Sequence, residues 1–170
     1  MEKRSKYNVS NLEQKRSFNG IVFDSEMEMR YYVSVILPAM QRGEIVRCER
    51  QKVYTLQPKF RYKGKAVQPI EYKADFYIEY KSGAVQVIDV KGCADPVAKL
   101  KRKIFWYTYP ETEYLWIGYS ELDGGWVTYE KIQKGRKLRK KLNGNNKGAK
   151  NGKSKKRVCG KKEGSISPRG

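Results

Sequence analysis

Two stretches decide the fold: KADFY at residues 73–77 and VIDVKG at residues 87–92, with a short turn between them. Each reads as a β-strand that carries an aspartate where strands usually carry valine or isoleucine. Asp89 and Lys91 are two residues apart, so a strand presents both side chains on one face. If the strands pair across the turn, Asp75 comes near Asp89 at one end of a β-hairpin.

Two carboxylates in such a position favour a bound cation. At about 4 Å they repel each other by about 4 kcal/mol at an effective dielectric constant of about 20. A hard divalent ion removes the repulsion, taking Asp75, Asp89 and the Val90 carbonyl as oxygen ligands. Lys91 can then hold a water molecule or a phosphate oxygen, as hydrolysis of a phosphodiester requires. The other interpretation is a structural ion pair between Asp89 and Lys91, with Asp75 as a polar residue of the strand surface.

The distribution of charge divides the chain into three segments. The net charge is +19, and residues 134–170 hold 15 basic residues and one acid, against 22 basic and 17 acidic residues before them. We therefore expect a flexible basic arm at 1–18, a globular domain at 19–133 and a basic DNA-binding tail at 134–170. The tail's composition predicts disorder from about Asn143. So large a positive charge indicates an anionic partner, nucleic acid.

The missing residue types exclude several classes of site. The chain has no histidine, so Ser-His-Asp triads, Cys-His pairs and Cys₂His₂ zinc fingers are ruled out. The three cysteines, Cys48, Cys93 and Cys159, are odd in number and far apart, which fits a reducing compartment. No apolar run resembles a signal peptide or a membrane span. We expect a soluble cytoplasmic protein without a membrane partner.

Local patterns predict helices and strands in alternation. Ser25 and Glu28 fit a capping box that starts a helix, which should falter near Pro38 and end at Gly43. Asp95 and the proline after it start a second helix. Its expected apolar stripe is Val97, Leu100, Ile104 and Tyr107. We expect strands within 44–56, 68–80, 84–90 and 113–119. The fold class is therefore α/β: a central mixed sheet, flanked by helices.

At this point the motifs resemble those of a known group. An aspartate, a hairpin and Asp-x-Lys, with a glutamate on the preceding helix, resemble the PD-(D/E)xK nuclease superfamily. This group includes restriction endonucleases, Holliday-junction resolvases and transposon end-cleaving nucleases. FDSxxExRxY at 23–32, YKADF at 72–76 and DVKG at 89–92 are similar to a small phage and prophage family of endonucleases. The resemblance covers about residues 18–120, and it departs from the usual motif at Ala74, where proline is common.

The resemblance implies a restriction-endonuclease-like core and a role for each motif residue. Asp75 and Asp89 would bind the metal, Lys91 would orient the water, and Glu28 would complete the site from the first helix. Glu26 is an open alternative to Glu28, because a capping-box glutamate needs no catalytic role. The cofactor would be Mg²⁺, with Mn²⁺ as a substitute.

The expected function is a Mg²⁺-dependent endodeoxyribonuclease in phage DNA recombination, replication or repair, in a bacterial or infected host cell. By the resemblance, cleavage leaves a 5′-phosphate and a 3′-hydroxyl, and a form acting on Holliday junctions would be a homodimer. Lys99, Arg102 and Lys103 are candidates for contacts with DNA phosphates, although charged helix residues commonly just face solvent. The alternatives are a non-catalytic basic nucleic-acid-binding protein and a restriction-type or end-processing nuclease.

Overall fold

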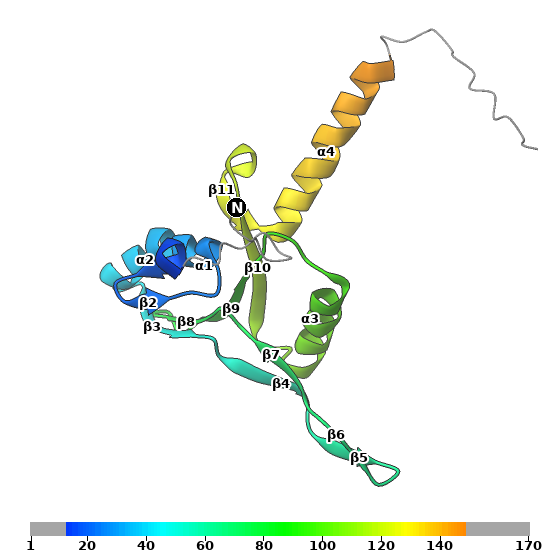
Figure 1. The fold of residues 1–170 in the computed structure, drawn as a ribbon. Helices are drawn as coiled ribbons and strands as arrows, with labels where there is room; N and C mark the ends of the chain where they lie inside the picture. The colour runs from blue at the N-terminus through cyan, green and yellow to red at the C-terminus, as the bar shows by residue number, and fades with distance from the viewer. Residues whose placement is uncertain (1–12, 149–170) are drawn as a thin grey trace, which may run out of the picture. The chain divides into compact units, whose positions relative to one another are not determined.

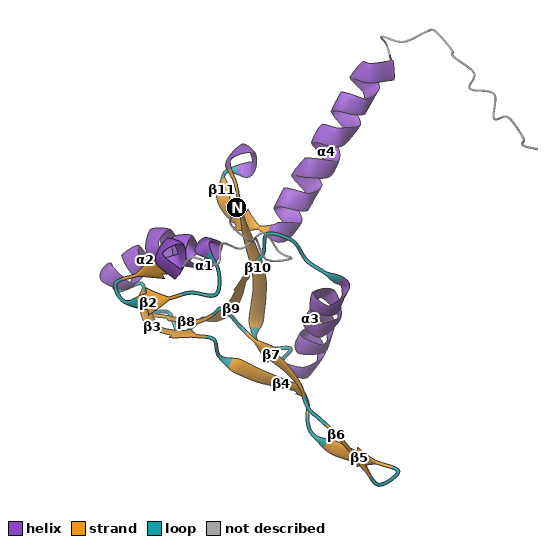
Figure 2. Cartoon of the chain, in the orientation of Figure 1, coloured by secondary structure: helices purple, strands orange, loops and turns teal. Residues whose placement is uncertain are grey.

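The computed structural model describes residues 13–148 (Figures 1 and 2). The described residues fall into two units: one runs up to residue 135 and holds the sheets, and the other begins at residue 136. Of the predicted arm at 1–18, residues 1–12 lie outside the described part, and the rest forms a 3₁₀ turn, η1 (Glu13–Arg16), and a short strand, β1 (Ser17–Phe18). None of the helices among the described residues is long and apolar enough to cross a membrane.

The central sheet has five strands in the order β11-β10-β9-β8-β3. Their bounds are Ile45–Arg50 for β3, Phe76–Tyr80 for β8, Val85–Val90 for β9, Glu113–Ser120 for β10 and Gly125–Thr128 for β11. β9 and β10 run parallel, and the other neighbours are antiparallel. β9 is the central strand, as its run of apolar residues predicts. A mixed sheet flanked by helices confirms the predicted fold class.

Three two-stranded ladders accompany this sheet. β1 pairs with β2 (Ile21–Val22), β4 (Val53–Gln57) with β7 (Ile70–Lys73), and β5 (Phe60–Tyr62) with β6 (Lys65–Val67). The last two follow one another along the same pair of chain segments and extend away from the central sheet (Figure 1).

The first helix begins at its capping box and contains a π-helical turn. α1 (Glu26–Tyr31) is capped by Ser25, whose hydroxyl accepts a hydrogen bond from the Glu28 N–H. A π-helical segment (Tyr32–Ile36) joins it to α2 (Leu37–Gln41). The wider turn directly precedes Pro38, which lacks an N–H and whose ring would clash with the preceding turn of a regular helix.

Side chains of β9 alternate between two cores on opposite faces of the sheet. Ile88 and Val90 belong to the core under α1 and α2, whereas Val87 belongs to the core under α3 (Pro96–Thr108). Figure 1 shows these helices on either side of the sheet. Asp89 lies two residues after Val87 on the same strand, so its side chain points to the same face of the sheet, toward α3.

The predicted strand over 68–80 is two strands in different sheets. β7 pairs with β4 and β8 pairs with β3 and β9, while Ala74 and Asp75 lie between them. The neighbouring segment, which joins β3 to β4, bends at the same level, where Gln51 has a left-handed φ of 58°. Consequently Ala74 is buried in the core under α3 and Phe76 in the core under α1, not on one shared face as regular alternation predicts.

The predicted apolar stripe of α3 is wrong at three of its four positions, while Ile104 packs against the core under α3 as expected. Val97, Leu100 and Tyr107 are exposed, and Phe105 is the fully buried residue of this helix. The reason is that aromatic contacts to Tyr54 and Tyr114 orient the helix through Phe105 rather than through the face with more apolar residues.

The last helix extends into the predicted tail. The 3₁₀ turn η3 (Glu121–Asp123) and β11 lead to α4 (Tyr129–Gly148). The first part of the 134–170 segment is therefore helical, including positions just beyond Asn143 where we expected disorder. Residues 149–170, the rest of the predicted tail, lie outside the described residues.

Candidate active site

The break before β8 and the end of β9 bring the predicted acids together. Phe76 pairs with Ile88, so Asp75 and Asp89 occupy the next positions of the hairpin. The two carboxyl groups are close enough for the charge of Asp89 to raise the pKa of Asp75. A backbone N–H, that of Val90, donates to Asp75 Oδ2 at 2.7 Å. The central expectation from the sequence, that these two side chains meet, agrees with this geometry.

Asp75 holds a proton in this environment. Burial, followed by the charges of Asp89 and Glu28, raises the pKa of Asp75 from 3.8 to about 9. At neutral pH the Asp75 carboxyl is therefore neutral and can donate to Asp89. The carboxyl groups of Glu28 and Asp89 are buried and that of Asp75 is partly buried, so negative charges on them are poorly screened by solvent.

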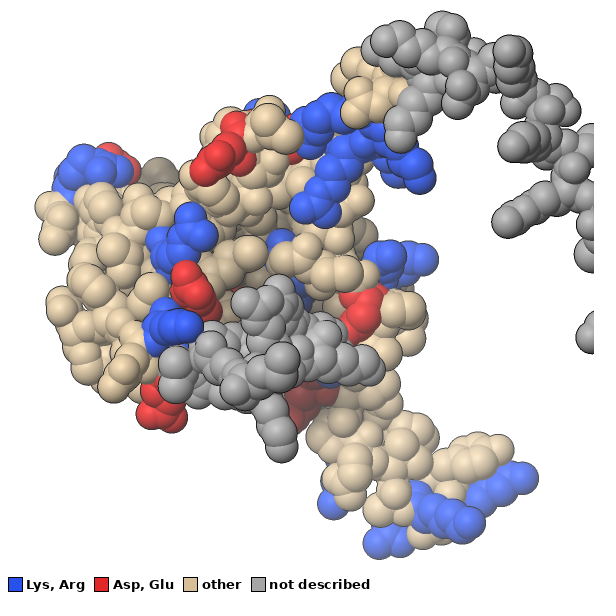
Figure 3. Space-filling view, turned by 45° about the horizontal axis from the view of Figure 1, so that its top comes forward, with Lys and Arg blue, Asp and Glu red and all other residues tan. Residues whose placement is uncertain are grey.

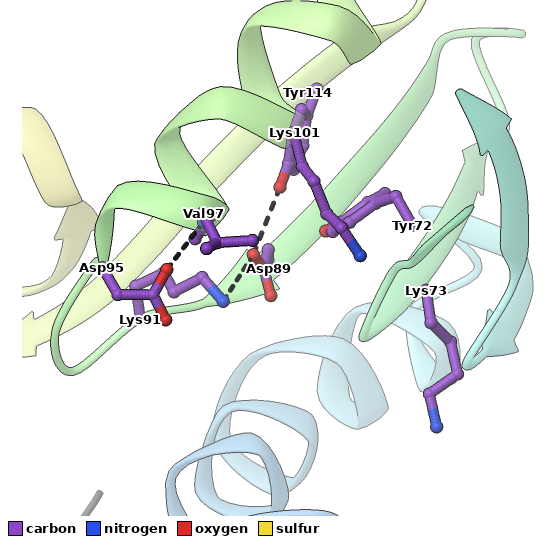
Figure 4. A pocket seen from close by; sticks show the side chains of 9 residues that line it. Tyr72, Lys73, Asp89, Lys91, Asp95, Val97, Lys101 and Tyr114 are labelled. Carbon is purple, nitrogen blue, oxygen red and sulfur yellow. Dashed lines mark hydrogen bonds and ion pairs between the residues drawn. The ribbon is translucent and has the colours of Figure 1, made fainter. Parts of the chain in front are cut away.

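Asp89 is held by two donors on the α3 side of the sheet. Its side chain is nearly inaccessible, and Oδ2 lies 2.8 Å from Lys91 Nζ and 3.2 Å from the Tyr114 hydroxyl (Figure 4). The Tyr114 hydroxyl in turn accepts a hydrogen bond of 2.7 Å from Trp116 Nε1. Burial and the nearby Asp89 charge raise the pKa of Tyr114, so its hydroxyl stays protonated and donates. This chain fixes the orientation of the Asp89 carboxylate.

Lys91 remains a cation. Its burial alone would lower the pKa, but the charge of Asp89, the hydrogen bond to it and the charge of Asp75 raise the pKa overall. The pKa of Lys91 rises because these acids together outweigh desolvation. Lys91 therefore serves as a charged donor and not as a neutral base.

Glu28, rather than Glu26, faces the acid pair. Glu28 is 7% exposed, and the Ser25 hydroxyl donates to its Oε1 at 2.7 Å. Burial raises the pKa of Glu28, and the charge of Asp89 adds to the effect, while the Ser25 hydrogen bond opposes it. Glu26 is exposed. The capping box thus places Glu28 within electrostatic reach of Asp75 and Asp89.

This donor set fits a hard divalent cation. Glu28, Asp75 and Asp89 supply carboxylate oxygens, and the Val90 backbone lies against Asp75. The charges of Asp89 and Glu28 contribute to the raised pKa of Asp75, and a bound cation would offset them. Among residues 13–148 no three His, Cys, Asp or Glu side chains are already spaced as a ligand set, so a cation would have to displace the Asp75 proton and draw the carboxylates in.

A pocket of about 320 Å³ opens beside Asp89 and Lys91 (Figure 4). It is mostly lined by charged and aromatic side chains: Tyr72, Lys73, Asp89, Lys91, Asp95, Val97, Ala98, Lys101 and Tyr114. Asp75 and Glu28 do not line it, so Asp89 is the residue shared by the acid cluster and the pocket. Three lysines around one opening suit an anionic group such as a phosphate.

Of the helix residues predicted to contact DNA, two are exposed and one is partly buried. Lys99 and Lys103 are exposed. Arg102 is 11% exposed in its side chain, pairs with Glu130 and lies 4.3 Å from the centre of the Trp116 ring. Aromatic packing and the ion pair occupy the Arg102 guanidinium, so a DNA phosphate would have to displace Glu130, and the predicted contact stays a prediction.

Lys101 is the basic residue of α3 that lines the pocket, and the sequence analysis did not single it out. Lys101 lies four residues after Val97, and both line the pocket. Helical spacing from the Asp95 cap could have found it. The structure also adds two pocket residues from β7. The Lys73 ammonium is 3.5 Å from Asp24. The buried Tyr72 hydroxyl lies beside Tyr114, and this hydroxyl has no well-aligned hydrogen-bond partner among the described residues.

Comparison with known proteins gives one family. The family model described as "Protein of unknown function (DUF1064)" matches residues 4–123, a span that includes the acid cluster and the pocket. No curated protein matches the chain.

Proposed function

This chain belongs to the DUF1064 family of proteins of unknown function, and we propose that it is a metal-dependent endodeoxyribonuclease that hydrolyses DNA phosphodiester bonds. The observation that carries the proposal is the meeting of Asp75, Asp89 and Lys91 at the end of one hairpin. Glu28 reaches the same acids from α1, and a lysine-lined pocket opens beside them.

Each residue has a defined task in this proposal. Asp89, held by Tyr114, would bind a cation together with Asp75, Glu28 and the Val90 carbonyl. Lys91 has three N–H donors, of which one is directed to Asp89, so the others can hold a phosphate oxygen or the attacking water. When bound, a divalent cation supplies charge neutralisation at the phosphate and acidifies water.

The finer form of the proposal follows the resemblance. A Mg²⁺-dependent enzyme, with Mn²⁺ as a substitute, would leave a 5′-phosphate and a 3′-hydroxyl. Similarity to phage and prophage endonucleases points to branched DNA as a substrate, with a homodimer placing two sites on two strands. A restriction-type or end-processing nuclease would use the same residues on linear duplex.

A second candidate is a non-catalytic nucleic-acid-binding protein. It is favoured by the Asp89–Lys91 pair, which at 2.8 Å is complete without a cation. In that case the acids would have a structural role, and the lysines of the pocket would only hold DNA.

Plasmid nicking separates the two candidates. We expect supercoiled plasmid to be nicked with Mg²⁺ or Mn²⁺ and not with EDTA. Asp89→Asn and Lys91→Met should abolish nicking while DNA binding persists. Glu28→Gln should reduce nicking strongly, and its matched control, Glu26→Gln on the exposed side of the same helix, should not. A four-way junction compared with linear duplex then tests the substrate.

A wild-type protein that binds DNA but cuts no substrate with either metal would overturn the nuclease proposal in favour of the binding protein. Equal loss of nicking in Glu26→Gln and Glu28→Gln would remove Glu28 from the site.

A further inference from the structure

The β5–β6 hairpin is a cationic arm with no evident role in the fold. Residues 58–69 contain four basic residues and no acid: Lys59, Arg61, Lys63 and Lys65. Figure 3 shows blue side chains gathered on this projecting hairpin. Every residue of β5 is exposed, and no residue of either strand belongs to a hydrophobic core.

The hairpin is nevertheless well formed. Its two-residue turn, Lys63-Gly64, has φ values of 46° and 79°, the conformation of a type I′ turn that matches the twist of paired strands. Three cross-strand pairs follow, from Tyr62–Lys65 to Phe60–Val67. An exposed ribbon with no core of its own gains little stability from burial, so its ordered shape and charge suggest binding.

Aromatic and basic side chains alternate along β5. Phe60 and Tyr62 share one face and are 45% and 61% exposed, whereas Arg61 points to the other face. The Lys63 ammonium lies 5.6 Å from the centre of the Tyr62 ring. Aromatic rings between cations suit a nucleic acid, which offers both phosphates and flat bases or sugars.

The arm is continuous with the candidate active site. β7 follows β6 and carries Tyr72 and Lys73 into the pocket wall. The turn at Gly64 is nine residues from Lys73 along the chain, which is at most about 30 Å in extended backbone. This reach corresponds to about nine base pairs of duplex DNA at about 3.4 Å each.

We propose that the β5–β6 hairpin binds double-stranded DNA, entering its major groove within about one helical turn of the phosphate held at the pocket. The identity of the polymer rests on the proposed function. The width of the major groove, about 12 Å, admits a two-stranded β-ribbon. Arg61 and Lys63 contact phosphates at the rim, and Phe60 and Tyr62 face the groove.

The test compares two double variants that remove equal charge. Arg61→Gln with Lys63→Asn removes two of the four positive charges of the arm, asparagine being tolerated at the left-handed position of Lys63. The control is Arg42→Gln with Lys81→Gln: the exposed Arg42 follows α2, and the exposed Lys81 follows β8 at the end opposite Asp75. Binding of a fluorescent duplex of about 30 base pairs is measured by anisotropy in EDTA over a range of salt concentrations.

We expect the arm variant to bind roughly tenfold or more weakly at about 0.1 M salt, with a salt slope smaller by about 2, since each phosphate contact contributes about 0.9. The control should match the wild type, and thermal melting should be unchanged in both. Equal affinity and slope in the arm variant and the control would overturn the proposal. A change in self-association without a change in DNA binding would also overturn it, since the arm would then contact a second copy.

Because the binding assay contains no metal, its outcome does not depend on catalysis. If the wild type never cuts but the arm variant loses affinity, the nuclease proposal fails and the arm proposal stands. If the arm variant binds DNA like the wild type while metal-dependent nicking is observed, the reverse holds.

Discussion

At the scale of single residues, the site depends on a hydrogen-bond chain that the motif does not contain. Trp116 donates to Tyr114, which donates to Asp89, and Lys91 holds the same oxygen of Asp89. Tyr114 is a positioning residue: it acts through Asp89 rather than on the substrate. Its removal should therefore affect both folding and the orientation of the carboxylate.

Tyr114→Phe tests this role. We expect a loss of about 1–3 kcal/mol in unfolding free energy, because the buried Trp116 N–H loses its acceptor. Nicking at saturating DNA should fall roughly tenfold, as one interaction of about 1.4 kcal/mol would give. Tyr109→Phe is the control, since its exposed hydroxyl donates only to the Thr55 carbonyl. Wild-type nicking by Tyr114→Phe would contradict the positioning role.

The proton on Asp75 makes stability depend on pH. The pKa of Asp75 is 3.8 in the unfolded reference and about 9 when folded, so the folded state binds the extra proton. The stabilisation is complete below about pH 4 and is lost as the pH rises through about 9. In EDTA the melting temperature should fall over this range, and Asp75→Asn should flatten the dependence.

The same residue should link stability to metal. Mn²⁺ or Mg²⁺ should raise the melting temperature of the wild type more at about pH 8 than at about pH 6, since the cation replaces the Asp75 proton. At a concentration of 100 times Kd, the expected gain is about 2.7 kcal/mol. Asp75→Asn should lose most of this gain. A metal-induced shift of equal size in the variant would show that the cation binds elsewhere.

At the scale of elements, β10 supports the site loop through a glycine. A Cβ on Gly118 would lie 3.0 Å from the Lys91 carbonyl oxygen and 2.8 Å from Ile132 Cδ1. The Lys91 N–H donates to the Ile117 carbonyl at 2.7 Å, so the segment that carries Lys91 is attached to β10 at this level. The position therefore requires a residue without a side chain.

Gly118→Ala should move Lys91. We expect a destabilisation of about 1–3 kcal/mol, as for other overpacked sites, together with reduced nicking. Adding Ile132→Val to Gly118→Ala removes the contact between the new methyl group and Ile132 Cδ1. The contact with the Lys91 carbonyl oxygen remains. The double variant should thus recover stability more than nicking, as urea unfolding and plasmid assays on the same samples would show. Parallel recovery of both would mean that Lys91 had not moved.

At the scale of the whole molecule, charge is concentrated outside the sheet domain. Residues 134–170 hold 15 of the 37 basic residues of the chain. Both hydrophobic cores lie within residues 18–132, so removal of the second compact unit, 136–170, leaves them intact. The expected contribution of this segment is non-specific attraction to phosphates.

Deletion of residues 136–170 should weaken DNA binding and flatten its salt dependence without changing turnover at saturating DNA. If about six to ten of its charges meet phosphates, the wild type should lose about 10³–10⁵-fold in affinity between about 50 and 200 mM salt, and the deletion much less. Titrations of both proteins at these salt concentrations measure the difference. Loss of turnover at saturating DNA would show that the segment takes part in the chemistry.

Structural features that depend on a few adjacent residues could be predicted well from the sequence. The Ser25 cap, the Asp95–proline helix start and the apolar β9 segment depend on a few adjacent residues, and the structure has each of them. The approach of Asp75 to Asp89 also follows from local geometry, because a hairpin brings the two ends of its strands together.

The mixed fold class, the pairing of the two acid-bearing segments and the excess of positive charge all follow from the amino-acid sequence. Three features required the folded structure: Asp75 lies in a break between sheets, Glu28 rather than Glu26 faces the acids, and Lys101 lines the pocket whereas Arg102 packs against Trp116. Such outcomes depend on contacts between segments distant in the chain. Their energies come from the packing of several elements at once, which no short pattern of residues specifies.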